Sequence, residues 1–132
     1  MIEIKPGPEL DRAVAEAIGL QVEEYYLPSF CAVFLPDGKT ADEFGAKGFA
    51  ASLDSGERPV HWAPSTDLDA AFAAAEGVGL FDDPSVLLRK GQRNGEICWF
   101  LDRDVGIPIS IVFAHTPALA ICAAVLKLAE KQ

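Results

Sequence analysis

The hydrophobic residues of this 132-residue chain follow helical spacing in three segments, near its beginning, its middle and its end. Each segment opens with residues typical of a helix N-terminus and carries apolar residues three or four positions apart. Gly19 and Gly77 close the first two segments as C-caps. The pattern predicts helices over Pro8–Gly19, Ser65–Gly77 and Thr116–Gln132.

Between these segments the apolar residues form short runs bounded by Pro, Gly, Asn and Asp, which is the pattern of strands. Asn94-Gly95 is the dipeptide that most strongly favours a two-residue hairpin turn. The stretch 40–63 is the least regular part, and a long connection of this kind is either functional or a tolerated surface insertion. The predicted strands cover 21–26, 29–35, 85–90, 95–101 and 107–114.

The order of helix, strands, helix, strand meander and helix predicts a single α+β domain over residues 1–132. We expect a mainly antiparallel sheet of about five strands with helices on both faces. Half of the residues are hydrophobic, which suffices for a packed core. The longest apolar stretch, 107–114, is too short to span a membrane, and the first residues lack an apolar signal core. We therefore expect no membrane association and a cytoplasmic location.

The formal net charge is −9, with 11 basic residues scattered among 20 acidic ones. Binding to the backbone of DNA or RNA requires clustered Lys and Arg, so we expect no direct nucleic-acid binding. Cys31, Cys98 and Cys122 form no CxxC pair and lie in apolar runs, which predicts reduced thiols in the core. Neither His61 nor His115 has a partner at metal-ligand spacing, so we expect no metal and no cofactor.

Three motifs together resemble one known family. They read LDRAVAEAIG at 10–19, PSTDLDAAF at 64–72 and TPALAICAAVL at 116–126. They are similar to the LDxxVAExxxG, YSTDxxAAW and TAPLAICxAxL motifs of the phage ABA sandwich domain proteins, which are short proteins of phages and prophages. Pro64 and Phe72 stand where that family has an aromatic residue and a tryptophan. The resemblance implies a three-layer α/β/α sandwich, a role in a bacterial host cell and no established catalytic activity.

Ser65-Thr66-Asp67, at the start of the middle helix, is the strongest local candidate for a site. Hydroxyl and carboxylate groups at this point cap the free backbone N–H groups of a helix, and we favour this structural role. The same N–H groups could instead hold an anionic ligand. His61 and Trp62, just before them, could stack against a ring, although such a pair more often packs where a loop enters a helix.

The second half of the chain adds a basic cluster and another helix start. Arg89, Lys90 and Arg93 lie on the predicted hairpin, where they are either solvated or hold a phosphate or an acidic partner. His115 and Thr116 open the third helix, which gives this segment a hydroxyl for capping and an imidazole.

These residues leave three classes of function open. The first, which we favour, is a non-enzymatic phage accessory protein that binds a host protein or a small molecule, as a monomer or a homodimer. The second is a protein that binds or sequesters a small molecule, a nucleotide being one candidate. The third is a small hydrolase using His61 or His115, which needs one of these histidines beside Ser65 or a carboxylate in a cleft. A triad of Ser65, His115 and Asp67 is one such arrangement, but no nucleophile-elbow motif supports it. We predict no catalytic residue, and the candidate ligand-binding residues are His61, Trp62, Ser65, Thr66, Asp67, Arg89, Arg93, His115 and Thr116.

Overall fold

The computed structural model describes residues 5–23, 29–35, 42–46, 59–82, 86–105 and 107–130, without the side chains of 103–105, 107–111 and 130. These residues form the helices α1 (Pro8–Ala17), α2 (Leu68–Val78) and α3 (Pro117–Glu130). The short 3₁₀ helices η2 (Asp42–Phe44) and η3 (Leu80–Asp82) lie on either side of α2 in the chain. The strands are β1 (Gln21–Glu23), β2 (Ala32–Phe34), β3 (Val60–His61), β4 (Val86–Arg93), β5 (Glu96–Val105) and β6 (Ile107–Ala114).

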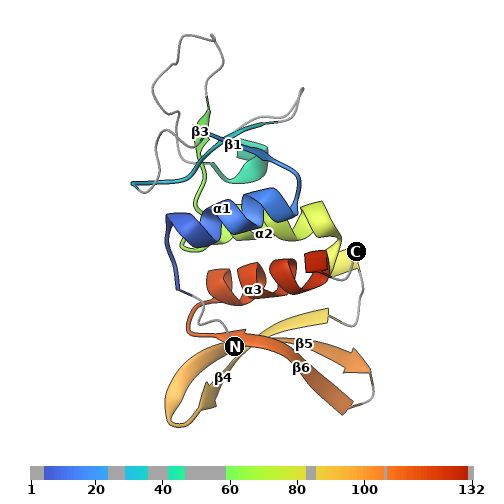
Figure 1. Cartoon of the computed structure of the whole chain (residues 1–132). Coiled ribbons are helices and arrows are strands. Elements are labelled where there is room, and N and C mark those ends of the chain that lie inside the picture. Colours follow the sequence, from blue (N-terminus) through green and yellow to red (C-terminus); the bar gives the residue numbers. More distant parts are fainter. Residues whose placement is uncertain are drawn as a thin grey trace.

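The described strands form two antiparallel sheets of three strands each, one at each end of the structure (Figure 1). The first sheet has the order β1-β2-β3 and the second has the order β4-β5-β6. α1 and α2 form a layer beside the first sheet, and α3 lies between that layer and the second sheet (Figure 1). The described elements are therefore layered with the helices inside and a sheet on each outer side.

This arrangement confirms the α+β class and the three predicted helices, but the described strands do not form the expected single sheet with α/β/α layering. The physical reason lies in α3. Every residue from Ala118 to Val125 is buried, so α3 is buried around its whole circumference and not along one stripe. Such a helix needs apolar neighbours on two sides, and it has the other helices on one side and β5 and β6 on the other.

The segment η2 packs tightly against the start of α2. Gly45 follows η2 with a φ of +67°, and a Cβ atom there would lie 2.5 Å from the backbone nitrogen of Ala70. The indole N–H of Trp62 donates a hydrogen bond of 2.7 Å to the carbonyl of Phe44. Only glycine allows this close approach of the two backbones, because any side chain would overlap with α2.

The hairpin of the second sheet follows the predicted turn. Asn94 and Gly95 both have positive φ angles, 54° and 83°, as a type I′ turn requires. β4 and β5 extend further than predicted because they pair along the whole hairpin, whereas β6 has the predicted bounds. β3 was not predicted, since its two residues lie within the irregular stretch 40–63, and they pair with β2. Residues 47–58 of that stretch lie outside the described residues.

Candidate functional site

The turn before α2 is organised by capping. Asp67 is the N-cap, and its Oδ1 accepts hydrogen bonds from the backbone N–H groups of Asp69 at 2.9 Å and Ala70 at 3.3 Å. Thr66 lies one residue before the cap, and its hydroxyl is 3.5 Å from the carbonyl oxygen of Ala63. The helix therefore begins later than predicted, because the carboxylate of Asp67 reaches two N–H groups that would otherwise be unpaired.

Ser65 is buried and joins α1 to this turn. Its backbone N–H donates to the carboxylate of Asp11 at 2.8 Å, and its Oγ accepts from the N–H of Gly7 at 3.0 Å. Burial raises the pKa of Asp11, and the hydrogen bonds from Ser65 and the nearby His61 partly offset this effect. The polar groups of Ser65 are thus engaged within the fold, which gives the residue a role in holding two helices together.

Trp62 and His61 differ in exposure. Trp62 is fully buried, and its N–H is used by Phe44, so its ring offers no stacking surface to a ligand. His61 is half-buried in β3, with its ring centroid 4.8 Å from that of Phe30. β3 belongs to the first sheet and β4 to the second, at opposite ends of the layered structure (Figure 1). One pocket that combines His61 with the basic hairpin is therefore not formed.

At the start of α3, Thr116 accepts a hydrogen bond of 3.2 Å from the backbone N–H of Leu119. His115 is exposed, and its Nδ1 lies 4.0 Å from the Sγ of Cys98 on β5. The Oγ of Ser65 is used by the backbone of Gly7, and no hydrogen bond among the described residues joins Ser65, His115 and Asp67. The contact with Cys98 was missed because it depends on the pairing of β5 with β6, which local patterns do not specify.

Cys31, Cys98 and Cys122 are free and buried, as expected, but only two of them belong to the main core. Burial raises the pKa of Cys31 to about 12, and burial also raises the pKa of Cys122. These two are therefore neutral thiols with a structural role. Cys98 lies on the opposite side of the second sheet from that core.

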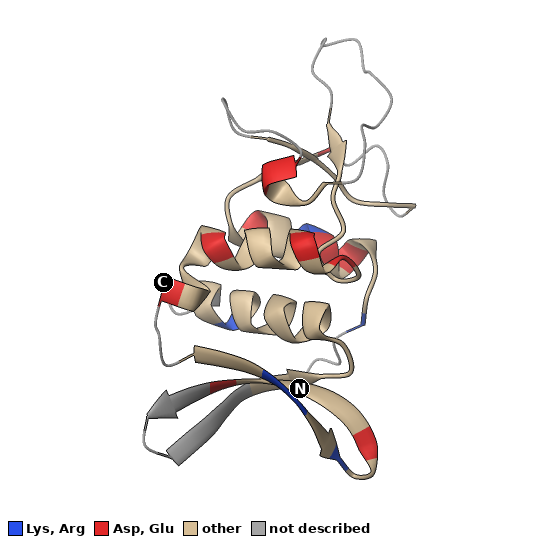
Figure 2. Ribbon diagram, turned by 180° about the vertical axis from the view of Figure 1, so that it is seen from behind, with Lys and Arg blue, Asp and Glu red and all other residues tan. Residues whose placement is uncertain are grey.

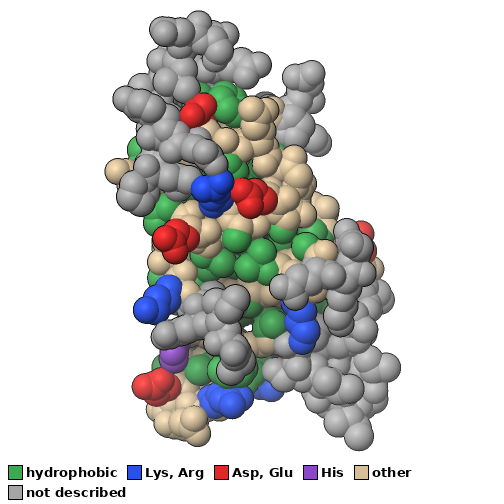
Figure 3. Space-filling model, in the orientation of Figure 1, with side chains coloured by type: hydrophobic (Ala, Val, Ile, Leu, Met, Phe, Trp, Pro, Cys, Tyr) green, Lys and Arg blue, Asp and Glu red, His purple; other side chains and the backbone are tan. Residues whose placement is uncertain are grey.

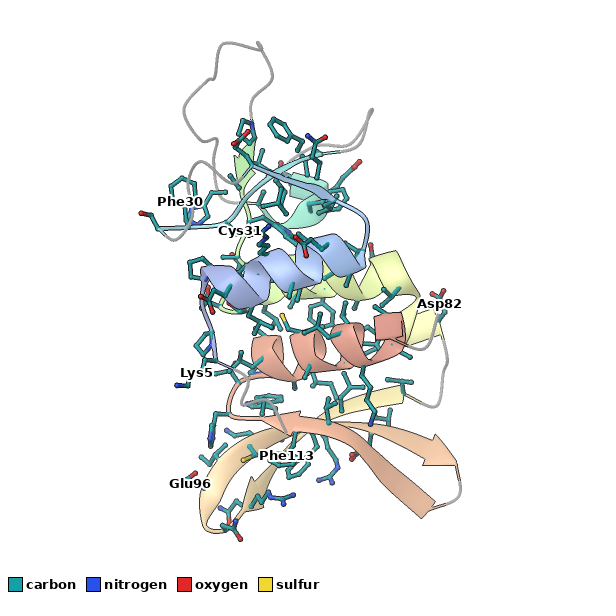
Figure 4. All side chains as sticks on the ribbon, in the orientation of Figure 1. Lys5, Phe30, Cys31, Asp82, Glu96 and Phe113 are labelled. Carbon is teal, nitrogen blue, oxygen red and sulfur yellow. The ribbon has the colours of Figure 1, made fainter. Side chains whose placement is uncertain are left out.

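Arg89 and Arg93 lie on the face of the second sheet that points away from α3. Side chains alternate along a strand, and Leu88 packs against the core whereas Leu87 is 48% exposed. Figure 4 shows Phe113 on the same side, away from α3. We call this surface the outer face, and its described members are Leu87, Arg89, Gly91, Arg93, Glu96, Cys98, Phe100, Asp102 and Phe113.

Each arginine of the outer face lies over an aromatic ring of another strand, Arg89 over a ring of the adjacent strand β5 and Arg93 over a ring of β6, beyond β5. The Cζ of Arg89 is 4.6 Å from the ring centroid of Phe100, and the Cζ of Arg93 is 4.1 Å from that of Phe113. The two phenylalanine centroids are 6.1 Å apart, so the rings form one aromatic floor beneath the arginines. Phe100 is 9% exposed and Phe113 is 42% exposed. The end of the outer face at Arg93 is therefore the open end.

The two arginines differ in their charge partners. Arg89 forms an ion pair with the carboxylate of Asp102, which is 2% exposed and whose Oδ1 has no hydrogen-bond partner among the described residues. Arg93 stands opposite Glu96 in the strand register, but no ion pair of Arg93 is found in the described part of the chain. The charge of Arg89 is thus balanced within the fold, whereas the guanidinium of Arg93 keeps its N–H donors available.

No family model, no curated protein and no solved structure matches this chain.

None of the described helices has both the length and the apolar composition needed to cross a membrane. Among the described residues, no three side chains of the His, Cys, Asp or Glu types are grouped so that they could hold a metal ion. The available guanidinium of Arg93 over the exposed Phe113 ring makes the outer face the candidate binding surface. Figure 3 shows basic, acidic and hydrophobic side chains together at this end of the molecule.

Proposed function

We propose that this chain is a non-enzymatic binding protein whose outer face holds an acidic group of its partner. The observation that carries the proposal is the guanidinium of Arg93, which lies over the exposed ring of Phe113 and has no ion pair in the described residues. A guanidinium presents N–H groups in a planar fork that matches a carboxylate or a phosphate. Stacking on Phe113 restricts the side chain before the partner arrives, which lowers the entropy lost on binding.

The resemblance of three motifs to the phage ABA sandwich domain proteins supports a narrower proposal. We infer an accessory protein of a phage or prophage that acts in the cytoplasm of a bacterial host, as a monomer or a homodimer. A non-enzymatic role is supported by the structural use of Ser65 and Asp67, whose polar groups are engaged in the hydrogen bonds of a helix start.

We favour an acidic protein over a small molecule as the partner. The reason is that Arg89 is paired with Asp102 and Lys90 lies on the opposite face of β4, so Arg93 alone offers too few groups to enclose a small molecule. A small molecule, with a nucleotide as one candidate, is the second candidate. It is favoured by the proximity of the Phe113 ring to Arg93, because a base could stack where a phosphate meets the guanidinium.

The test compares three forms of the protein, namely the wild type, Arg93→Glu, and Arg12→Glu as a charge-matched control on α1. Each form is analysed by native mass spectrometry and is then used for affinity capture from its native cell lysate. We expect an acidic protein to bind the wild type and the control but not Arg93→Glu. An added small mass with the same dependence on Arg93 would favour the second candidate. Binding that is unchanged in Arg93→Glu would contradict the proposed surface.

A further inference from the structure

The outer face carries two opposite charges that do not pair with each other. Arg93 and Glu96 stand opposite each other in the register of β4 and β5, and both residues are exposed. Opposite charges in such cross-strand positions normally attract each other. Here the guanidinium of Arg93 instead reaches across β5 to the ring of Phe113 on β6, and no ion pair of Glu96 is found among the described residues. One surface therefore presents a cation and an anion at two separate points.

The charges described on the outer face balance, although the chain as a whole is acidic. Arg89 is paired with Asp102, and Arg93 is matched in number by Glu96. The formal net charge of the chain is −9, and a large net charge of one sign makes copies of a protein repel each other. Figure 2 shows both signs of charge on the second sheet and mostly acidic residues on the helices. Among the described surfaces, the outer face is therefore one on which two copies can approach without like charges meeting.

The middle of the outer face is apolar. The ring of Phe113 is 42% exposed and lies beside the ring of Phe100, and Leu87 on β4 is 48% exposed. The described helices all lie on the other side of this sheet (Figure 1), where α3 packs on β5 and β6. An exposed apolar centre with charged residues at its margin is the usual composition of a protein–protein interface.

We propose that a second copy of this chain packs its outer face against the first about a two-fold axis, so that Arg93 of each copy meets Glu96 of the other. This inference rests on the proposed function and identifies the acidic partner as the chain itself. In a two-fold interface each contact occurs twice, so one reciprocal pairing engages all four of these charges. The Phe113 rings would lie between the two ion pairs. A face of three short strands is small for an interface, so we expect a weak dimer with a dissociation constant in the micromolar range.

The experiment measures the association of the full chain by sedimentation velocity at concentrations up to about 1 mM. Arg93→Glu and Glu96→Arg would each bring like charges together at both symmetric contacts. Arg12→Glu on α1 and Glu76→Arg on α2 make the same changes in charge outside the outer face. We expect each outer-face variant to weaken the dimer at least about tenfold, and each control to associate like the wild type.

Two further samples separate an effect on the interface from an effect on folding. The double variant Arg93→Glu/Glu96→Arg exchanges the two charges and makes the surface complementary to itself again. An equimolar mixture of the two single variants should also regain the dimer, because each variant carries the charge that the other lacks. Native mass spectrometry identifies this species as a heterodimer by its mass. Mixing cannot repair a folding defect within one chain, so a restored dimer reports on the contact between chains.

The outcomes distinguish this inference from the proposed function. If the wild type remains monomeric at about 1 mM, self-association is overturned, while Arg93-dependent capture of a different acidic protein would still support the proposed function. If only Arg93→Glu weakens the dimer and the mixture does not restore it, pairing with Glu96 is wrong and another acidic group meets Arg93. If a dimer forms that neither single variant weakens, the outer face is not its interface and the inference is overturned.

Discussion

The carboxylate of Asp11 accepts a hydrogen bond of 2.8 Å from the backbone N–H of Ser65 and ties α1 to the turn before α2. Both residues are buried, so Asp11→Ala would leave a buried N–H group without an acceptor. We expect this variant to lower the free energy of unfolding by about 1–3 kcal/mol in urea denaturation. Asp11→Asn keeps an oxygen acceptor and should lose much less at neutral pH. Equal losses in the two variants would contradict this role.

The same carboxyl group gives a prediction for pH. Burial raises the pKa of Asp11 above its ordinary value of 3.8, so the folded state holds this proton more tightly than the unfolded state does. Protonated Asp11 therefore stabilises the folded state. This stabilisation is fully present below the ordinary pKa and is lost as the pH rises through the raised pKa. The melting temperature of the wild type, relative to that of Asp11→Asn, should therefore fall as the pH rises from about 4 toward neutrality. A relative increase over this range would refute the assignment.

Gly45 and Gly19 form a matched pair for testing the close approach of η2 to α2. Both have positive φ angles, but a Cβ atom on Gly19 would meet nothing within 4 Å, whereas one on Gly45 would overlap with the backbone of Ala70. We expect Gly19→Ala to cost about 1 kcal/mol, the conformational cost alone. Gly45→Ala should cost about 3 kcal/mol or more. Similar values from thermal unfolding would show that the approach is looser than described.

The N-cap of α2 can be tested in the same way. Asp67→Ala removes the acceptor for the N–H groups of Asp69 and Ala70 and should cost about 1 kcal/mol. Thr66→Ala, one residue earlier, should change the stability by less than about 0.5 kcal/mol. If Thr66→Ala is the more damaging change, the helix begins where the sequence predicted and not at Asp67.

The two outer-face arginines should differ in their effect on stability. Arg89→Ala removes the ion-pair partner of the buried Asp102, and we expect a loss of about 2 kcal/mol. Arg93→Ala removes an exposed contact with Phe113 and should cost less than about 1 kcal/mol. Chemical denaturation of the two variants tests this contrast. A large loss for Arg93→Ala would mean that this side chain is structural, which would weaken its assignment to binding.

The helices and the hairpin turn were predictable because the residues that specify each of them are neighbours in the sequence. Pro at the first helical position marks the start of both α1 and α3, Thr116 caps α3, and Asn94-Gly95 defines the hairpin turn. The two-sheet layering was missed because it depends on how α3 is surrounded. The run from Ala118 to Val125 is an unbroken apolar stretch, which is typical of a helix buried on all sides, whereas apolar spacing of three or four positions predicts only one buried side.

The candidate site was predictable only in part. The cluster of Arg89 and Arg93 stands out in the sequence because the other basic residues of this acidic chain are scattered. Their aromatic partners were not predictable, since the pairing of Phe100 with Phe113 depends on strand register, and β6 shifts its register opposite Leu101 and Asp102. Residues such as Ser65 and Asp67 were candidates because helix caps and ligand-binding groups use the same side chains.

The most direct test of the outer face as the binding surface is NMR chemical-shift mapping. The ¹⁵N-labelled wild-type protein is titrated with a short, terminally blocked acidic peptide of alternating Glu and Val, and the shifted amide signals are assigned to residues. The account predicts that the largest shifts lie on the outer face, around Arg93 and Phe113. Shifts concentrated on Leu68–Val78, or an unchanged spectrum at millimolar peptide, would contradict it.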